Sequence, residues 1–273
     1  MTYKLLAFDM DGTLLNSQKK ISPKTLAAIS ELSRRGVFVA VSTGRGVAEM
    51  AEHMEKLNFM HYGILESGGL VYNFFNETPV ALHTIEESIA QKIIDAGIIE
   101  NTMIHIHTIK GSIQRAEDIK NAADFQIAVY QEMYERISTH CDDFKKFVHE
   151  HSNEILKINL YHRNLESRLR SLERLKNLNI TLAFSEITSL ESSPKGVTKG
   201  AGLVELCKFL NIDVAETVAV GDAPNDIDIL KTAGIAAVMG NASDEIKKFA
   251  DFVTDDNDHD GIVKVIEKYF YNH

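Results

Sequence analysis

Two carboxylates, Asp9 and Asp11, stand two residues apart, directly after the apolar run at residues 3–8. That run predicts a buried strand that ends at Asp9. Burying two negative charges at the end of a strand is costly unless a cation lies between them, and a divalent metal meets that need. The pattern therefore predicts an acidic active site at the end of a core strand.

Two more predicted core strands also end in polar residues. The apolar run 37–41 leads into Ser42-Thr43-Gly44-Arg45, the run 217–220 leads into Gly221-Asp222, and Lys199 opens a predicted helix. In a doubly wound sheet, ligands bind at the carboxyl ends of the strands. Carboxylates, a hydroxyl, backbone N–H groups and an ammonium suit phosphoryl transfer, which needs a nucleophile and charge neutralisation around phosphorus.

Two roles follow for the first pair of carboxylates. Asp9 is the candidate nucleophile, which forms an aspartyl-phosphate. Asp11 is the candidate acid/base, which protonates the leaving alcohol and then deprotonates water. The acid role requires a pKa for Asp11 above the ordinary ~3.9. Neighbouring carboxylates would raise that pKa and a bound metal would lower it, and the sequence does not tell which effect is larger. Taken singly, each segment also fits a turn, a helix cap or a solvated lysine, but their joint position favours a site.

Composition limits the classes of partner. The 273 residues carry a formal net charge of -10, which argues against a broad surface for nucleic acid or an anionic membrane. Only two cysteines occur, Cys141 and Cys207, which is typical of a reducing compartment, and Cys207 is expected to be a core thiol. No signal peptide or apolar run of 18 residues is visible, so a cytoplasmic location is expected. Monomer and dimer both stay open.

The predicted elements divide into two kinds of region. Strands and helices alternate in residues 1–83 and 191–273, which predicts one α/β domain with a doubly wound, mostly parallel sheet. Within residues 84–190, the runs 104–107 and 157–160 alternate between apolar and polar side chains, as half-exposed antiparallel strands do. An inserted α+β domain is therefore expected at 84–190.

At this point the sequence resembles the haloacid dehalogenase-like superfamily and, within it, the Cof-type phosphatases with a large cap. Residues 9–13 (Asp-Met-Asp-Gly-Thr) resemble the first family motif, with Asp9 as nucleophile and Asp11 as acid/base. The segment after the second predicted strand resembles the second motif, in which Thr43 and the Gly44 N–H hold phosphate. The resemblance runs over nearly the whole chain, and its specific motifs lie toward the two ends.

The third and fourth motifs lie in the last part of the chain. Lys199 matches the lysine of the third motif, and residues 221–226 are similar to the fourth. There the resemblance implies that Asp222 binds Mg²⁺, that Asn225 touches phosphate and that Asp226 supports the metal shell. After the third predicted strand the chain departs from the family's Asn-Gly, because Glu66-Ser67-Gly68-Gly69 stands there, so a substrate contact from this loop is not carried over.

The resemblance also implies which groups bind the metal and that the inserted domain moves. Mg²⁺ is expected on the carboxylates of Asp9 and Asp222, the main-chain carbonyl of Asp11, phosphate and water. The insertion at 84–190 is expected to be a mobile cap that sets specificity for a small phosphorylated metabolite. In full, the predicted phosphate-binding residues are Met10, Thr43, Gly44, Lys199 and Asn225, and the predicted metal-binding residues are Asp9, Asp11, Asp222 and Asp226.

Several alternatives remain beside phosphomonoester hydrolysis. A sugar-phosphate mutase needs a second acceptor site, for which the sequence shows no feature, and a dehalogenase leaves Asp11 and the metal ligands without a role. A phosphate-responsive regulatory module uses similar strand-end aspartates but needs no cap of about a hundred residues. Lys195, four residues before Lys199, is a rival phosphate ligand.

Two further patterns are weaker. Residues 256–261 with Glu267 fit a Ca²⁺ loop, but a short strand rather than a helix precedes them, so Asp258 or Asp260 is expected to cap the final helix. His105 and His107 share one face of a strand, and a polar sheet face explains them better than a metal site. If that face meets the substrate, the candidate contacts are His105, His107, Lys110 and Arg115.

Overall fold

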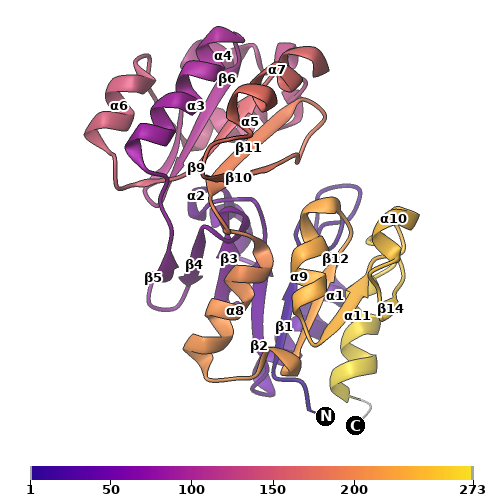
Figure 1. The fold of residues 1–273 in the computed structure, drawn as a ribbon. Helices are drawn as coiled ribbons and strands as arrows, with labels where there is room; N and C mark the ends of the chain where they lie inside the picture. Colours follow the sequence, from indigo (N-terminus) through magenta and orange to yellow (C-terminus); the bar gives the residue numbers. More distant parts are fainter. Residues whose placement is uncertain (1, 272–273) are drawn as a thin grey trace. The chain divides into compact units, whose positions relative to one another are not determined.

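The computed structural model describes residues 2–271, which fold into two compact units (Figure 1). The first unit comprises the chain up to Gly44, Glu52–Ala81 and the chain from Thr198 onward. The second unit comprises Arg45–Ala51 and Leu82–Val197. Each unit has a sheet and an apolar core of its own. The domain limits expected from the sequence, at 83/84 and 190/191, stay a prediction.

The first unit is built on an eight-stranded sheet in which most neighbouring strands are parallel. Strand β4 runs antiparallel to β3. In sheet order the strands are β14 (Phe252–Val253), β13 (Ile235–Val238), β12 (Thr217–Gly221), β1 (Leu5–Phe8), β2 (Phe38–Ser42), β3 (Tyr62–Leu65), β4 (Leu70–Asn73) and β5 (Thr78–Leu82). This topology confirms the predicted α/β class with a mostly parallel sheet.

The register of the central strands brings their carboxyl ends together. All four residues of β1 are buried, as their continuous apolar character requires in a sheet covered on both faces. Phe8 is opposite Val41 of β2 and Val220 of β12. Asp9 continues this pairing, because its N–H donates to the Val220 carbonyl at 3.0 Å. The residues that follow β1, β2 and β12 therefore lie at one edge of the sheet.

Helices cover both faces of this sheet (Figure 1). Leu203, Leu206 and Cys207 of α8 pack with Ala7 and Ala219 in the core, so the prediction of a buried Cys207 thiol is confirmed. The helices of this unit are α1 (Pro23–Arg34), α2 (Val47–Met54, shared with the second unit), α8 (Lys199–Leu210), α9 (Ile227–Thr232), α10 (Asp244–Lys247) and α11 (Gly261–Ile266). This unit also has the 3₁₀ helices η1 (Glu66–Gly68), η4 (Val214–Glu216) and η5 (Pro224–Asp226) and the π-helix η6 (Glu267–Tyr271).

The second unit is an α+β structure around a six-stranded sheet. The strands, in sheet order, are β10 (Ile180–Ala183), β11 (Ser189–Pro194), β9 (Ile155–Tyr161), β6 (Met103–Thr108), β7 (Gly111–Gln114) and β8 (Ser138–His140). The helices are α3 (Glu87–Ile99), α4 (Ala116–Lys120), α5 (Gln131–Ile137), α6 (Phe144–Glu150) and α7 (Leu165–Leu175), with turns η2 (Ala122–Phe125) and η3 (Ala128–Tyr130). Its apolar core lies between one sheet face and α3, α6 and α7.

One sequence-based expectation for this sheet is wrong. The runs 104–107 and 157–160 do form antiparallel strands, β6 and β9, but every residue of both strands is buried rather than half-exposed. Their polar side chains contact one another, as Asn159 does with His107 and Tyr161. Alternation of apolar and polar residues predicts a solvated face only when no other group covers it.

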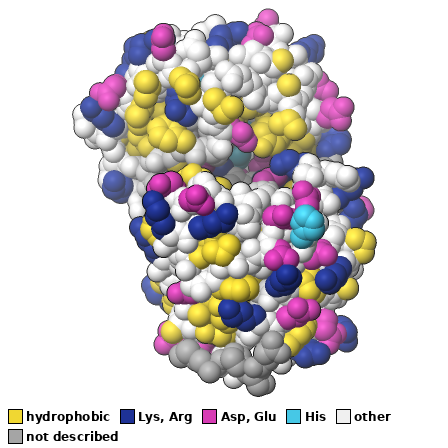
Figure 2. Space-filling view, turned by 90° about the vertical axis from the view of Figure 1, so that its right-hand side faces the viewer, with side chains coloured by type: hydrophobic (Ala, Val, Ile, Leu, Met, Phe, Trp, Pro, Cys, Tyr) yellow, Lys and Arg dark blue, Asp and Glu magenta, His cyan; other side chains and the backbone are white. Residues whose placement is uncertain are grey.

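The distribution of charge on the surface indicates which kinds of partner the protein can bind. In Figure 2, lysine and arginine side chains are interspersed with aspartate and glutamate on the face shown, in keeping with the net charge of -10. Within residues 2–271, no helix combines the length and the apolar character needed to cross a bilayer.

Candidate active site

The candidate site forms around a buried ion pair between the first and third predicted motifs. Asp9 follows β1, and Lys199 is the first residue of α8; both side chains are almost completely buried. The Lys199 Nζ donates to Asp9 Oδ1 at 2.6 Å and to Asp226 Oδ1 at 2.6 Å. Residues 190 positions apart in the chain are thus in direct contact. The rival lysine, Lys195, is exposed.

Asp226 organises the turn that follows β12. While its Oδ1 receives the Lys199 ammonium, its Oδ2 accepts the backbone N–H groups of Asp222 and Ala223, each at 3.0 Å. The carboxylate therefore closes the turn and fixes the backbone of Asp222. Asp9, Asp222 and Asp226 each offer a carboxylate oxygen, and these three atoms lie within 4.8 Å of one another.

The charges of this cluster are unbalanced. Burial raises the pKa of Asp9 to about 8, against the opposing effect of Lys199. Burial likewise raises the pKa of Asp222 to about 6, with Asp226 adding to the effect and the Thr13 hydroxyl opposing it. Burial alone lowers the pKa of an ammonium, yet the Asp226 and Asp9 carboxylates raise that of Lys199. One ammonium thus faces three carboxylates, and positive charge is deficient.

This deficit is the feature that a divalent cation fits. Oxygen ligands from carboxylates are those that Mg²⁺ prefers, and it is usually held by few carboxylates together with substrate phosphate and water. Asp9 and Asp222 are the residues that would hold it, and Asp226 holds the backbone of Asp222. A bound Mg²⁺ supplies positive charge to phosphoryl oxygens and to the carboxylates.

Asp11 lies at the outer side of the cluster. Its side chain is 33% exposed, and its Oδ1 receives the Lys19 ammonium at 2.7 Å. Two residues further, Thr13 donates its hydroxyl to Asp222 Oδ1 at 2.7 Å, which ties the loop after β1 to the end of β12. Asp11 therefore keeps contact with solvent, whereas Asp9 does not.

The remaining predicted phosphate-binding residues occupy the expected strand ends. Met10 is completely buried, between Asp9 and Asp11 in the chain. Thr43 directly follows β2; its side chain is buried, its N–H donates to Ile64 at 2.9 Å, and Gly44 comes next. Asn225 is partly buried in η5, next to Asp226. Their roles toward phosphate remain a prediction.

Sequence reasoning missed three residues around the cluster. Asn241 donates to the Gly12 carbonyl at 2.9 Å and to Asp222 Oδ2 at 3.4 Å. Lys19 contacts Asp11, and Asp228 contacts the start of α8. None of the three belongs to a motif that the sequence displays by itself. Only the position of Asn241 just after the apolar run of β13, at another strand end, was a usable signal.

The Ca²⁺ pattern at residues 256–261 serves other contacts. As expected, a short strand, β14, precedes it. Asp260 is the N-cap residue of α11, as predicted, but its side chain makes no capping hydrogen bond. It accepts the Ser22 and Thr25 hydroxyls at the start of α1 instead, and Asp258 accepts the Ser17 N–H. These partners are more than 200 residues away, so local sequence does not reveal them. Among the described residues, neither aspartate belongs to a metal-ligand group.

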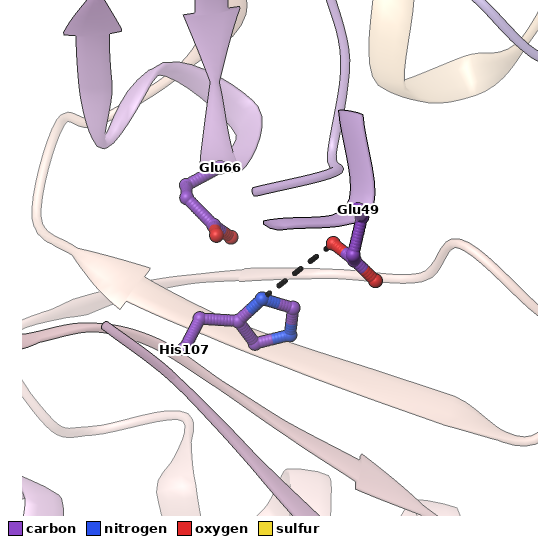
Figure 3. A group of neighbouring side chains, drawn as sticks. All are labelled: Glu49, Glu66 and His107. Carbon is purple, nitrogen blue, oxygen red and sulfur yellow. Dashed lines mark ion pairs between the residues drawn. The ribbon is translucent and has the colours of Figure 1, made fainter. Parts of the chain in front are cut away.

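The histidine pair lies in the second unit. His105 and His107 are buried, and their rings stack with centroids 3.7 Å apart. Figure 3 shows the Glu49 carboxylate facing the His107 ring, at 4.0 Å from Nδ1. Burial, followed by the Lys157 charge, holds the pKa of His107 well below its ordinary range, so at neutral pH this contact is not an ion pair. The polar face predicted for these residues exists, but it is buried.

Comparisons with known proteins match most of the chain. The family model of the haloacid dehalogenase-like hydrolases matches residues 6–266. The chain is 31% identical to 5-amino-6-(5-phospho-D-ribitylamino)uracil phosphatase YcsE of Bacillus subtilis, over 97% of this chain and 95% of that protein. It is 30% identical to HMP-PP phosphatase of Serratia proteamaculans, over 90% of this chain and 86% of that protein. A solved haloacid dehalogenase-like hydrolase from B. subtilis superposes with a TM-score of 0.87 at 27% identity, covering 97% and 99% of the two chains.

Proposed function

This chain is a phosphatase of the haloacid dehalogenase-like hydrolase family, and we propose that it hydrolyses a small phosphomonoester with Mg²⁺ through an aspartyl-phosphate on Asp9. The observation that carries the proposal is the Lys199 ammonium, 2.6 Å from both Asp9 and Asp226, with Asp222 in the same carboxylate cluster. A nucleophile, a fixed cation and oxygen ligands for a metal are the parts that phosphoryl transfer requires.

In the first half-reaction, the Asp9 carboxylate attacks phosphorus and the bond from phosphorus to the leaving alcohol oxygen breaks. Asp11 donates a proton to that oxygen, a role that its partial exposure allows. Lys199 holds the Asp9 carboxylate in place and offsets charge on the phosphoryl oxygens. Thr43 and the backbone N–H groups of Met10 and Gly44 bind these oxygens, together with Asn225.

In the second half-reaction, ionised Asp11 takes a proton from water. That water attacks phosphorus, the bond from phosphorus to the Asp9 oxygen breaks, and inorganic phosphate leaves. Asp9, Asp222 and the Asp11 carbonyl would hold Mg²⁺, which would supply positive charge at the phosphoryl oxygens. Residues 84–190 act as the cap that selects the leaving group.

The substrate is a small phosphorylated metabolite. The relatives named above are phosphatases of a phosphorylated ribitylaminouracil and of HMP-PP, both small molecules. Because the two relatives match this chain at nearly the same identity, their names do not select one substrate for it.

A screen of phosphorylated metabolites tests this proposal, with p-nitrophenyl phosphate as the generic substrate and release of inorganic phosphate as the readout. We expect many turnovers per enzyme with Mg²⁺ and loss of turnover with EDTA. Asp9→Asn serves as the blank and should lose at least about a thousandfold in kcat, as removal of a nucleophile does in other enzymes. Turnover retained by Asp9→Asn, or phosphorylation that stops at one phosphate per chain, would contradict the mechanism.

A further inference from the structure

The backbone on both sides of Lys199 is held by one carboxylate, that of Asp228. Thr198 precedes Lys199 and donates its hydroxyl to Asp228 Oδ2. Gly200 follows Lys199 and donates its N–H to the same oxygen at 3.1 Å. We propose that Asp228 is a positioning residue that sets the Lys199 ammonium against Asp9; this inference rests on the phosphatase function proposed above.

The Thr198 hydroxyl has two roles that lock it in place. Besides donating to Asp228, it accepts the Ala201 N–H at 3.1 Å and so forms the N-cap of α8. A hydroxyl that donates once and accepts once in this way has one orientation that satisfies both partners. Asp228 therefore sets the direction of the cap, and the cap sets where the first turn of α8 begins.

Close packing leaves this turn little room to adjust. A Cβ at Gly200 would overlap the Asp228 carboxylate and the Thr232 hydroxyl, and a Cβ at Gly68 would overlap the Thr198 carbonyl oxygen. Glycine is required at both positions because neighbouring groups approach the backbone closely. The start of α8 is thus confined between η1 on one side and α9 on the other.

A single segment of chain holds Lys199 at both of its ends. Asp226, in η5, receives the Lys199 Nζ, and Asp228, two residues later in α9, receives the backbone beside the Lys199 Cα. Fixing both ends of a four-carbon side chain removes most of the freedom that makes lysine an imprecise point charge. Asp228 is itself exposed and acts through Lys199 rather than on phosphate.

Substitution of Asp228 separates positioning from stability. Misplacement of a catalytic group by about 1 Å costs on the order of a hundredfold in rate, so Asp228→Ala should lower kcat by about 10- to 100-fold, with KM changed by less than about threefold. Asp228→Asn keeps an acceptor oxygen and should restore kcat to within about threefold of wild type. Both are measured with p-nitrophenyl phosphate and saturating Mg²⁺, well below the melting temperature.

The matched control is Asn164→Ala, which removes the N-cap of α7 in the second unit. It should lower the melting temperature without changing kcat. If Asp228→Ala behaves like this control, its role is structural and the proposal is wrong. If Asp228→Ala does not fold, Thr198→Val removes the hydroxyl half of the same link, and Thr198→Ser should rescue it.

Crystal structures of wild type and Asp228→Ala (or Thr198→Val) give a readout that does not depend on turnover. We expect the Lys199 Nζ to leave its 2.6 Å contact with Asp9. An unchanged contact overturns the positioning role whether or not the enzyme is active. Absence of turnover in wild type, in contrast, contradicts only the proposed function.

Discussion

Each unit buries a polar cluster against its sheet, and the two clusters handle charge in opposite ways. In the first unit, Lys199 keeps its charge because Asp9 and Asp226 each lie 2.6 Å from its Nζ. In the second unit, His105 and His107 stack at 3.7 Å, and burial holds the pKa of both rings well below the ordinary range. The first cluster gathers three carboxylates around one charged ammonium, whereas the second includes two histidines that lose their charge.

The two clusters also differ in their position in the sheets. Asp9 and Asp222 follow strand ends, where loops and a helix start supply further polar groups around them. His105 and His107 lie within β6, paired with Asn159 and Lys157 of β9, so their neighbours are fixed by strand register. The interior of the second sheet also holds charge, because Lys157 of β9 and Glu191 of β11 form a buried pair at 4.0 Å. The first cluster is therefore distinguished by its place at the strand ends, where ligands bind in sheets of this kind.

The largest expected effect comes from removing the one cation of the first cluster. Lys199→Met leaves Asp9 and Asp226 as buried, uncompensated carboxylates, which costs about 3–5 kcal/mol in the free energy of unfolding. Chemical denaturation at pH 7.5 without divalent metal measures it. This variant should also lose activity.

A surface pair in the second unit provides the contrast. Lys145 and Asp95 lie 2.8 Å apart with about half of each side chain exposed, so Lys145→Met should cost less than about 1 kcal/mol. Equal losses of unfolding free energy for Lys199→Met and Lys145→Met would mean that the buried carboxylates need their lysine no more than an exposed pair does. That result would contradict the contrast between the two sites.

The second effect is metal binding, which supplies the positive charge that the first cluster lacks. Mg²⁺ at a hundred times its dissociation constant should stabilise the protein by about 2.7 kcal/mol, seen as a rise in melting temperature that EDTA reverses. Asp222→Asn should abolish the rise, because it removes a carboxylate of the cluster. Asp258→Asn, in the Ca²⁺-like pattern, should retain it. If Asp222→Asn keeps the rise in melting temperature and Asp258→Asn loses it, the metal binds at residues 256–261 instead.

Most contacts of the first cluster could be predicted from the sequence, because they depend on strand patterns and motifs. Continuous apolar runs identified β1, β2 and β12, and the rule that parallel strands share a carboxyl edge brought Asp9 and Asp222 to one place. The α/β class was predictable for the same reason. The position of Lys199 rested on a motif, because nothing in the spacing alone brings residue 199 to residue 9.

The contacts of Asp228, Asp260 and the β6 histidines were not predictable. Asp228 and Asp260 bond to side chains at the starts of other helices, and such pairs depend on how elements pack rather than on local spacing. The strands β6 and β9 alternate like surface strands, yet their polar residues are buried and bond to one another. Periodicity gives the face on which a residue lies but not what covers that face.

The third expected effect is a pH dependence from the second cluster. The folded-state pKa values of His105 and His107 are lowered, so the unfolded chain binds more protons below its own histidine pKa of about 6.5. Stability is therefore fully present above that pH and falls as the pH drops below it, by up to about 1.4 kcal/mol per pH unit for each ring. Denaturation between pH 7.5 and 5.5 measures the slope.

A pair of histidine variants sharpens this test. His105→Phe keeps an aromatic ring beside His107 and removes one titrating group, so stability should fall less steeply below pH 6.5. His149→Gln removes an exposed histidine whose pKa the Glu87 carboxylate raises, and it should not reduce the acid sensitivity. If neither substitution changes the slope, the buried histidines are not the acid-sensitive groups.

The smallest expected effect is the loss of a helix cap, which tests whether the two clusters belong to separately stable units. Ser22 caps α1 in the first unit and Asn164 caps α7 in the second, and loss of such a cap costs about 1 kcal/mol. Because each unit has its own core, Asn164→Ala should lower amide hydrogen-exchange protection in β6 and β9 while leaving β1 and β12 unchanged, and Ser22→Ala should do the reverse. A uniform loss of protection in both variants would show that the chain opens as one cooperative structure, and the contrast between the clusters would then concern chemistry alone.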